Sequence, residues 1–275
     1  MPIHSHNCRP AIRRAIGPLV AGLLFALGGC STVAEEPHVA AERSQNVIDS
    51  PIRTDQDRHM DAERHPADFL AFTKVKPGMQ VLDVSAGAGY TSQLLALAVG
   101  PTGTVWAQRE QPGAALTKRL NDNSQANLLV VIRPFEDPVP EQAPKLDLIT
   151  LILNYHDITY LPVDRAKMNQ HLFAALKPGG HFVVIDHSAK AGADIAVGKS
   201  LHRIDEAIVL AEVRKAGFML EAESNFLRDP ADTREQSSVD AKIPTDKFAL
   251  RFVKPNSPAA IQLPSAVMPG TGPSQ

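Results

Sequence analysis

The sequence predicts an α/β protein with a Rossmann-like, doubly wound sheet of seven strands that ends in an antiparallel hairpin. Short apolar runs alternate with helical patterns between residues 66 and 216, and this alternation is typical of parallel strands with helices on both faces. Two further strand-like segments, 219–225 and 247–253, follow with no helical pattern between them. They are therefore expected to pair antiparallel and to close the sheet.

The strands of the parallel part are short and apolar, and the helices between them have recognisable ends. The run from Lys145 to Leu153 is almost continuously apolar, which indicates a strand buried on both faces. Pro66 suits the first turn of a helix, and Gly217 suits the position after the last turn. The expected strands are 81–84, 104–108, 128–132, 145–153 and 181–186. The expected helices begin after His65 and after Gly89 and cover 112–120, 164–176 and 204–216.

Composition sets limits on size and on partners. The chain has 275 residues, of which 44% are hydrophobic, enough for one domain with a full core. Its net charge of −2 argues against a nucleic-acid surface built on bulk charge. Aromatic residues are sparse, with a single Trp106, so base-stacking platforms are not expected. We therefore expect a small-molecule substrate and no nucleic acid.

The first thirty residues have the pattern of a bacterial lipoprotein signal. A positive segment that contains Arg13 and Arg14 precedes an apolar segment, 17–27, which is too short to span a bilayer comfortably. Leu27-Gly28-Gly29-Cys30 then resembles a lipobox, so Cys30 is expected to be lipidated. The alternatives are a plain signal peptide or an uncleaved anchor. The expected organisation is a signal peptide at 1–29, a polar tether at 30–54, one domain at 55–255 and a disordered tail at 256–275.

Both cysteines, Cys8 and Cys30, lie in this N-terminal region. The folded part is therefore expected to have neither a disulfide nor a cysteine-rich zinc site. Lipidation would attach the protein to a membrane of the cell envelope, with the domain facing the periplasm.

The stretch from Gln80 to Leu97 contains the main candidate for a binding site. A buried strand, a loop of small residues and a helix follow one another, which lets a ligand approach bare backbone amides at the helix N-terminus. Asp83 lies inside the strand, just before the loop Ser85-x-Gly87-x-Gly89. A carboxylate at this point would repel a pyrophosphate and suits a cationic ligand. The alternative is a tight turn that only packs the helix.

Four polar or semi-polar residues follow the buried strand 145–153, namely Asn154, Tyr155, His156 and Asp157. Ligands of such sheets bind beyond the carboxyl ends of the strands, and unpaired polar groups at that place need partners. His156 has the intrinsic pKa of a general base, and Asp157 could orient it. The alternative is a turn in which Asn154 and Asp157 cap the next segment.

Two more polar pairs are expected near this loop. Asp186-His187 ends a strand, and His202-Arg203 precedes the last helix. Together with His156 and Asp157 they offer nitrogen and oxygen ligands for a metal, but their spacing gives no support for such a site, and we expect no metal. His202-Arg203 could instead contact an anionic substrate or form a surface pair at a helix start.

From about Arg58 to Pro255 the chain resembles bacterial proteins known as predicted methyltransferases, of the class I S-adenosylmethionine-dependent type. The resemblance includes the acid-x-Gly-x-Gly-x-Gly motif, in which Ser85 replaces the first glycine, and the antiparallel final hairpin. It also rests on segments 76–79, 134–138, 154–157, 177–180, 186–187, 201–205, 216–218 and 245–248. It implies S-adenosylmethionine as cofactor and supplies no acceptor.

The resemblance also implies roles for single residues. Asp83, Ser85, Gly87, Gly89 and Tyr90 would surround the amino acid and ribose of the cofactor. In this family an acid after the second strand bonds the ribose hydroxyls. Arg109 occupies its place by register, so either the strand end shifts by one residue or Gln108 or Glu110 substitutes. Glu136 and Phe135 would contact the adenine, unless Glu136 and Asp137 are solvated acids before a turn. Asn154, Tyr155, His156 and Asp157 would face the transferable methyl group.

Three interpretations of function follow. The first is methyl transfer from S-adenosylmethionine to an unidentified small molecule. The second is an envelope lipoprotein that uses the same fold as a non-catalytic binding module. The third, a nicotinamide-dependent oxidoreductase, is disfavoured by Asp83 and by the lack of a suitable acid after the second strand. Export would separate the domain from its cofactor, unless Arg13-Arg14 belongs to a twin-arginine signal that exports the domain folded with cofactor bound.

Overall fold

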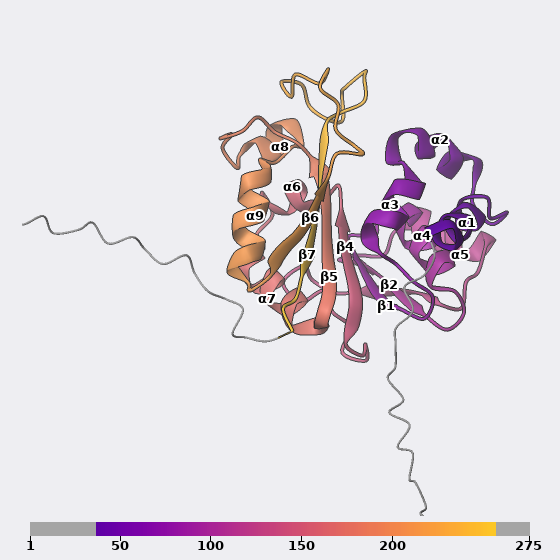
Figure 1. Cartoon of the computed structure of the whole chain (residues 1–275). Helices are drawn as coiled ribbons and strands as arrows, with labels where there is room; N and C mark the ends of the chain where they lie inside the picture. Colours follow the sequence, from indigo (N-terminus) through magenta and orange to yellow (C-terminus); the bar gives the residue numbers. More distant parts are fainter. Residues whose placement is uncertain (1–36, 257–275) are drawn as a thin grey trace, which may run out of the picture. The chain divides into compact units, whose positions relative to one another are not determined.

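The computed structural model describes residues 37–256 (Figure 1). The predicted signal peptide, the lipidation site at Cys30 and nearly all of the predicted tail lie outside these residues. Within the described part, no helix is long and apolar enough to cross a membrane.

One mixed sheet of seven strands forms the centre of the domain, and its order is β3-β2-β1-β4-β5-β7-β6. The first five strands are parallel and β7 runs antiparallel to both β5 and β6, so the predicted fold class is confirmed. The strands are β1 (Gln80–Val84), β2 (Thr104–Arg109), β3 (Leu128–Ile132), β4 (Leu146–Ile152), β5 (Leu176–His187), β6 (Met219–Ser224) and β7 (Lys247–Val253).

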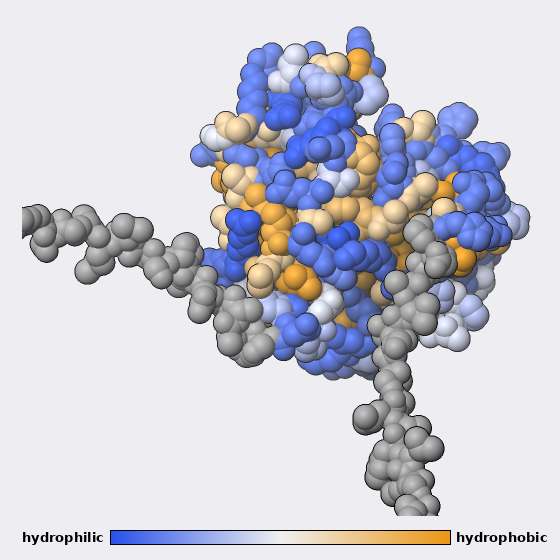
Figure 2. Space-filling view, viewed as in Figure 1, coloured by the Kyte–Doolittle hydropathy of each residue, from blue (hydrophilic) through white to orange (hydrophobic). Residues whose placement is uncertain are grey.

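Helices cover both faces of the sheet, as Figure 1 shows. One side carries α1 (Pro37–Ile48), α2 (Asp55–Arg64), α3 (Pro66–Thr73), α4 (Tyr90–Val99) and α5 (Ala114–Asp122). The other side carries α6 (Tyr155–Ile158), α7 (Arg165–Ala175), α8 (Val197–Leu201) and α9 (Glu206–Lys215). Figure 2 shows hydrophilic residues over most of this view, with hydrophobic residues gathered mainly in the middle, between the two groups of helices.

The alternation of side chains along each strand divides the core into two layers. In β1, Val81 packs with the α3 and α4 side, whereas Leu82 and Val84 pack with the α7 and α9 side. All three are fully buried, because parallel strands have helices on both faces. Burial on both faces also explains why these strands were visible in the sequence as unbroken apolar runs.

The predicted tether is wrong for residues 37–54. Residues 37–48 form α1, which contacts α3 and α4, and Val47 is buried in the core. The inward face of α1 includes the polar residues Arg43 and Ser44, so its apolar periodicity is weak. Helix α2 was also missed. It starts with a reciprocal capping box between Thr54 and Asp57, a polar signal rather than an apolar one.

Because β1, β4 and β5 are parallel, their carboxyl ends meet at one edge of the sheet. The glycine loop follows β1, the segment 154–157 follows β4, and Asp186 lies at the end of β5. The three candidate segments therefore lie at the same edge, as the order of strands predicts.

Candidate active site

The loop after β1 has left-handed backbone conformations at three positions. Ser85, Gly87 and Gly89 have φ angles of +58°, +56° and +87°, a conformation in which glycine is favoured. A Cβ on Gly87 would come no closer than 4.0 Å to any atom, whereas a Cβ on Gly89 would lie 2.6 Å from Leu116. Gly87 thus leaves room for a ligand, and Gly89 allows α5 to pack against the loop.

Asp83 lies beneath this loop and is 2% exposed. Its carboxylate accepts hydrogen bonds from Ser92 Oγ (2.5 Å) and Thr150 Oγ1 (2.7 Å). Burial raises the pKa of Asp83 to about 6, although the two hydroxyl donors oppose this rise. The acid therefore joins β1 to α4 and β4, and places negative charge under the loop.

A hollow of about 250 Å³ opens in front of the loop. This volume is just below the range of about 300–1,000 Å³ that is usual for small-molecule sites. Of the predicted cofactor residues, Asp83, Ser85, Gly87 and Tyr90 line it. The other lining residues are Met60, Arg64, Ala86, Ala88, Thr91, Ile152, Leu153 and Asn154. Met60 and Arg64 come from α2, whose polar sequence has no apolar periodicity to predict it.

Helix α2 is attached to the glycine loop by buried ion pairs. Arg119 forms two hydrogen bonds of 2.7 Å with the Asp57 carboxylate and donates to Ala88 O at 2.8 Å. Asp61 accepts a hydrogen bond of 2.6 Å from Tyr90 OH and pairs with Arg53. The Arg119 and Asp57 side chains are only 10% and 2% exposed, so the loop is held from behind by charges that lie away from water.

The residues predicted to hold ribose do not line the hollow. Gln108 is buried and holds the loop instead: its Oε1 accepts from Ser85 N at 2.9 Å. Arg109 donates to Gly87 O and to Gln111 O, so the residue at the usual place of the acid supports the loop backbone. Glu110 is exposed and accepts a long hydrogen bond, 3.4 Å, from Phe135 N.

The residues predicted to contact adenine also lie outside the lining. Phe135 is 5% exposed and packs in the core layer that faces α7 and α9. Its ring is therefore a core side chain and does not present a free face to a ligand. The Glu136 carboxylate accepts a 3.4 Å hydrogen bond from Asp164 N, next to α7.

A chain of hydrogen bonds joins the glycine loop to the segment after β4. Ser85 Oγ donates to Asn154 Oδ1 at 2.6 Å, and Asn154 Nδ2 donates to Asp157 Oδ2 at 3.0 Å. Asn154 also lines the hollow. The two segments that the sequence analysis singled out are therefore one connected site.

His156 is enclosed by two carboxylates. Its Nδ1 lies 2.6 Å from Asp186 Oδ1 and its Nε2 lies 3.1 Å from Asp157 Oδ1. Burial lowers the pKa of His156, but the hydrogen bonds to Asp157 and Asp186 outweigh it and raise the pKa to about 9. In contrast, burial lowers the pKa of the neighbouring His187 to about 2. His156 is thus held as an acid at neutral pH rather than as a free base.

Two predicted site residues point elsewhere. Tyr155 is fully buried; its hydroxyl donates to Glu212 and accepts from Asn169. Because adjacent residues of a helix face different directions, it packs in the core while His156 faces Asp186, and we remove it from the catalytic candidates. Arg203 is also fully buried, paired with Asp232, so it holds the 225–246 segment rather than contacting a substrate.

The family model of protein-L-isoaspartate(D-aspartate) O-methyltransferase (PCMT) matches residues 32–191, more than half of the chain. The chain belongs to this family. The prediction of an S-adenosylmethionine-dependent methyltransferase is therefore confirmed, and S-adenosylmethionine is its cofactor. The match begins before α1, in agreement with a domain that starts earlier than residue 55.

Curated relatives support the same class. A ubiquinone/menaquinone biosynthesis C-methyltransferase UbiE from Burkholderia multivorans is 31% identical over 135 residues, which are 47% of this chain and 53% of that protein. The UbiE of Cupriavidus pinatubonensis is 28% identical over 121 residues, 43% of this chain and 47% of that protein. The chain thus spans about half the length of the curated relatives it matches.

A solved structure shows the same fold. The S-adenosylmethionine-dependent methyltransferase from Aquifex aeolicus superposes with a TM-score of 0.53 and 19% identity, over 78% of this chain and 98% of that chain.

The residues present fit this cofactor. The open backbone at Gly87 and the hollow in front of it leave room for the cofactor's amino acid and ribose, and the Asp83 carboxyl beneath the loop suits a cationic sulfonium. Arg109 donates to Gly87 O and Glu110 does not line the hollow, so contacts to the ribose would come from backbone groups of the loop.

Proposed function

We propose that the protein transfers the methyl group of S-adenosylmethionine to a small, largely apolar acceptor that carries one anionic group. The proposal rests on a second, narrow hollow, of about 20 Å³, that adjoins the first and would widen to admit an acceptor. The two hollows share five residues, Arg64, Tyr90, Thr91, Ile152 and Leu153. Methyl transfer is an in-line displacement that needs donor and acceptor side by side, and adjoining hollows meet that need.

The lining of the second hollow supports the class of acceptor. Phe69, Ile185 and Leu227 contribute apolar surface, and Arg64 and Lys247 contribute cations. Lys247 is 5% exposed, and burial lowers its pKa. A flat apolar molecule with a carboxylate or an ionised hydroxyl would match this combination of apolar walls and buried cations.

S-adenosylmethionine supplies an electrophilic methyl group on a sulfonium. The chain's own contribution in this proposal is to align the acceptor and to attract its anionic form. Without a bound metal ion, Asp157 and Asp186 raise the pKa of His156 to about 9, so this proposal gives His156 no role in removing a proton from the acceptor. An acceptor that is already ionised needs no such base.

The relatives suggest two acceptor classes to compare. The UbiE proteins are named for C-methylation in ubiquinone/menaquinone biosynthesis, and the family model is named for isoaspartyl protein residues. The apolar hollow favours the first kind of molecule, an oxygenated ring. The test is transfer of a tritiated methyl group to hydroxybenzoates, whose carboxylate is ionised at neutral pH, with an isoaspartyl peptide beside them.

We expect methylation of the aromatic compounds. Lys247→Met should raise KM more than it lowers kcat, because Lys247 binds the acceptor before and during transfer. Lys145→Met, at an exposed lysine before β4, is the control and should change neither. Methylation of the peptide alone would contradict the acceptor class, and no methylation by a protein that binds S-adenosylmethionine would favour the binding-module interpretation.

We further propose that residues 1–29 are a signal peptide and that lipidated Cys30 anchors the domain to an envelope membrane, facing the periplasm. The support is the sequence pattern of residues 9–30. Labelling cells with a radioactive fatty acid should mark the wild-type protein and not Cys30→Ser. Equal labelling of both, or of neither, would contradict the proposal.

A further inference from the structure

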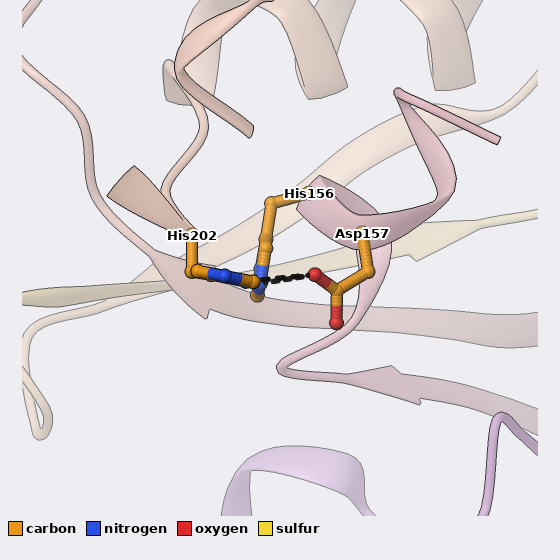
Figure 3. A group of neighbouring side chains, drawn as sticks. All are labelled: His156, Asp157 and His202. Atoms are coloured by element: carbon orange, nitrogen blue, oxygen red, sulfur yellow. Dashed lines mark hydrogen bonds and ion pairs between the residues drawn. The ribbon is translucent and has the colours of Figure 1, made fainter. Parts of the chain in front are cut away.

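Three side chains that can ligate a metal ion point toward one another at the carboxyl end of β4 (Figure 3). His156 and Asp157 belong to α6, and His202 is the residue that ends α8. One nitrogen from each histidine and one oxygen of the carboxylate all lie within 4.8 Å of one another. His202 follows Asp157 by 45 residues, which is why no spacing in the sequence predicts the cluster.

Three polar groups meet at one oxygen of Asp157. Its Oδ1 lies 3.1 Å from His156 Nε2 and 3.0 Å from His202 Nδ1, and it accepts a hydrogen bond from Tyr160 OH. A neutral imidazole carries a single N–H. If that proton of His156 lies on Nδ1, toward Asp186, the Nε2 lone pair faces an oxygen lone pair. Either a second proton on the ring or a metal ion would relieve the repulsion.

The ligand groups are oriented by partners behind them. Asp186 is fully buried; it accepts from the backbone N–H of His156 and contacts Nδ1 of the same residue. A carboxylate on the far nitrogen of a histidine is the usual support of a metal ligand. The other oxygen of Asp157 is held by Asn154.

His202 is held in a backbone conformation that non-glycine residues seldom adopt. Its φ is +50°, and Ser238 Oγ donates to its carbonyl oxygen at 2.8 Å. Such conformations persist where the surrounding structure enforces them, and they are frequent at functional sites. Here the conformation directs the imidazole at Asp157.

We propose that His156, Asp157 and His202 bind one divalent first-row transition-metal ion. Two imidazoles and one carboxylate are ligands that such ions accept, and three protein ligands leave a position open for a water or a substrate oxygen. The Asp157 and His202 side chains are 28% and 34% exposed, so the open position is accessible from solvent. An ion at this place would lower the pKa of a hydroxyl bound to it.

The site lies next to the cofactor hollow. Asn154 contacts both Asp157 and Ser85 and lines that hollow. The inference does not depend on the acceptor proposed above, because metal binding can be measured without cofactor or substrate.

The test is titration of the metal-free, full-length chain with Zn²⁺ by calorimetry and with Co²⁺ by visible absorption. His4, His6 and Cys8 near the N-terminus could also take up metal. The readout is therefore the difference between the wild type and His202→Gly in the number and affinity of metal-binding sites. Glycine removes the imidazole and suits the positive φ. His171→Ala is the control, because His171 lies near a single carboxylate, Asp137.

We expect the wild type and His171→Ala to bind the metal at one site with the same affinity, and His202→Gly to bind it there at least ~10-fold more weakly. The Co²⁺ spectrum of that site should lack the charge-transfer band that thiolate ligands give. Thermal unfolding of each variant shows that it is folded. Equal binding by the wild type and His202→Gly, or no binding at millimolar metal, would overturn the proposal and leave a proton on His156 as the source of positive charge.

Discussion

Asp83→Asn should change the stability of the fold in a manner that depends on pH. Burial raises the pKa of Asp83 from 3.8 to about 6, so the folded state holds the proton more tightly than the unfolded chain does. Below about pH 4 both states are protonated and this contribution to stability is complete. As pH rises through about 6, the unfolded chain is already ionised and the folded state must ionise a buried carboxyl, so stability falls.

The structure sets the size of this effect. One pH unit of difference in pKa is worth about 1.4 kcal/mol, so the rise from 3.8 to about 6 corresponds to about 3 kcal/mol. Asparagine has the same shape and does not titrate. The unfolded carboxyl is already about half ionised at pH 4, so urea unfolding of both proteins between about pH 4 and pH 7 should show the wild type losing about 2 kcal/mol relative to Asp83→Asn.

The control for this comparison is Asp122→Asn, at an exposed carboxyl that pairs with Lys118. Its stability relative to the wild type should vary by less than about 0.5 kcal/mol over the same range. A difference between the wild type and Asp83→Asn that stays constant with pH, or that changes in the opposite direction, would refute the reasoning.

Two further predictions concern the support of the glycine loop. Arg119→Met leaves the buried Asp57 carboxylate unpaired and should lower the free energy of unfolding in urea by about 3–5 kcal/mol. Lys118→Met, which breaks only the exposed pair with Asp122, should lower it by less than about 1 kcal/mol. Equal losses would show that the Arg119–Asp57 pair stabilises the fold no more than an exposed pair does. At Ser85, whose φ is +58°, both Ser85→Ala and Ser85→Gly remove the hydroxyl bond to Asn154, but only glycine relieves the backbone strain. Thermal unfolding should therefore find Ser85→Gly the more stable of the two by about 1 kcal/mol, and the reverse order would contradict that account.

The central strands β1 and β4 could be predicted because they are buried on both faces and so are nearly continuous in apolar residues. β3 was placed at its observed bounds, 128–132, and β7 at 247–253. Helices α1 and α2 were missed because polar residues hold them: a partly polar inward face in α1, and in α2 a capping box with ion pairs to Arg119 and Arg53. The missed capping box, Thr54 to Asp57, was the one local signal that could have revealed α2.

The site could be predicted to the level of loops but not of side-chain directions. The order of parallel strands brings the segments after β1 and β4 together, and Ser85 does contact Asn154. Two residues that are adjacent in the sequence can point in different directions, one toward the hollow and one into the core. Tyr155 packs inward while its neighbour His156 faces Asp186, and this choice depends on tertiary packing rather than on local sequence.

The measurement that tests the account most directly is calorimetric titration of the full-length chain with S-adenosylmethionine and with S-adenosylhomocysteine. We expect one binding site that Gly87→Ala weakens at least ~10-fold, since the new methyl group projects into the hollow where the closest atom, Ser85 O, is 4.0 Å away. Gly192→Ala is matched to it, with a positive φ of +78° and open space around the new Cβ, and should bind like the wild type. No binding at millimolar cofactor, or equal losses in the two variants, would contradict a cofactor site at the glycine loop.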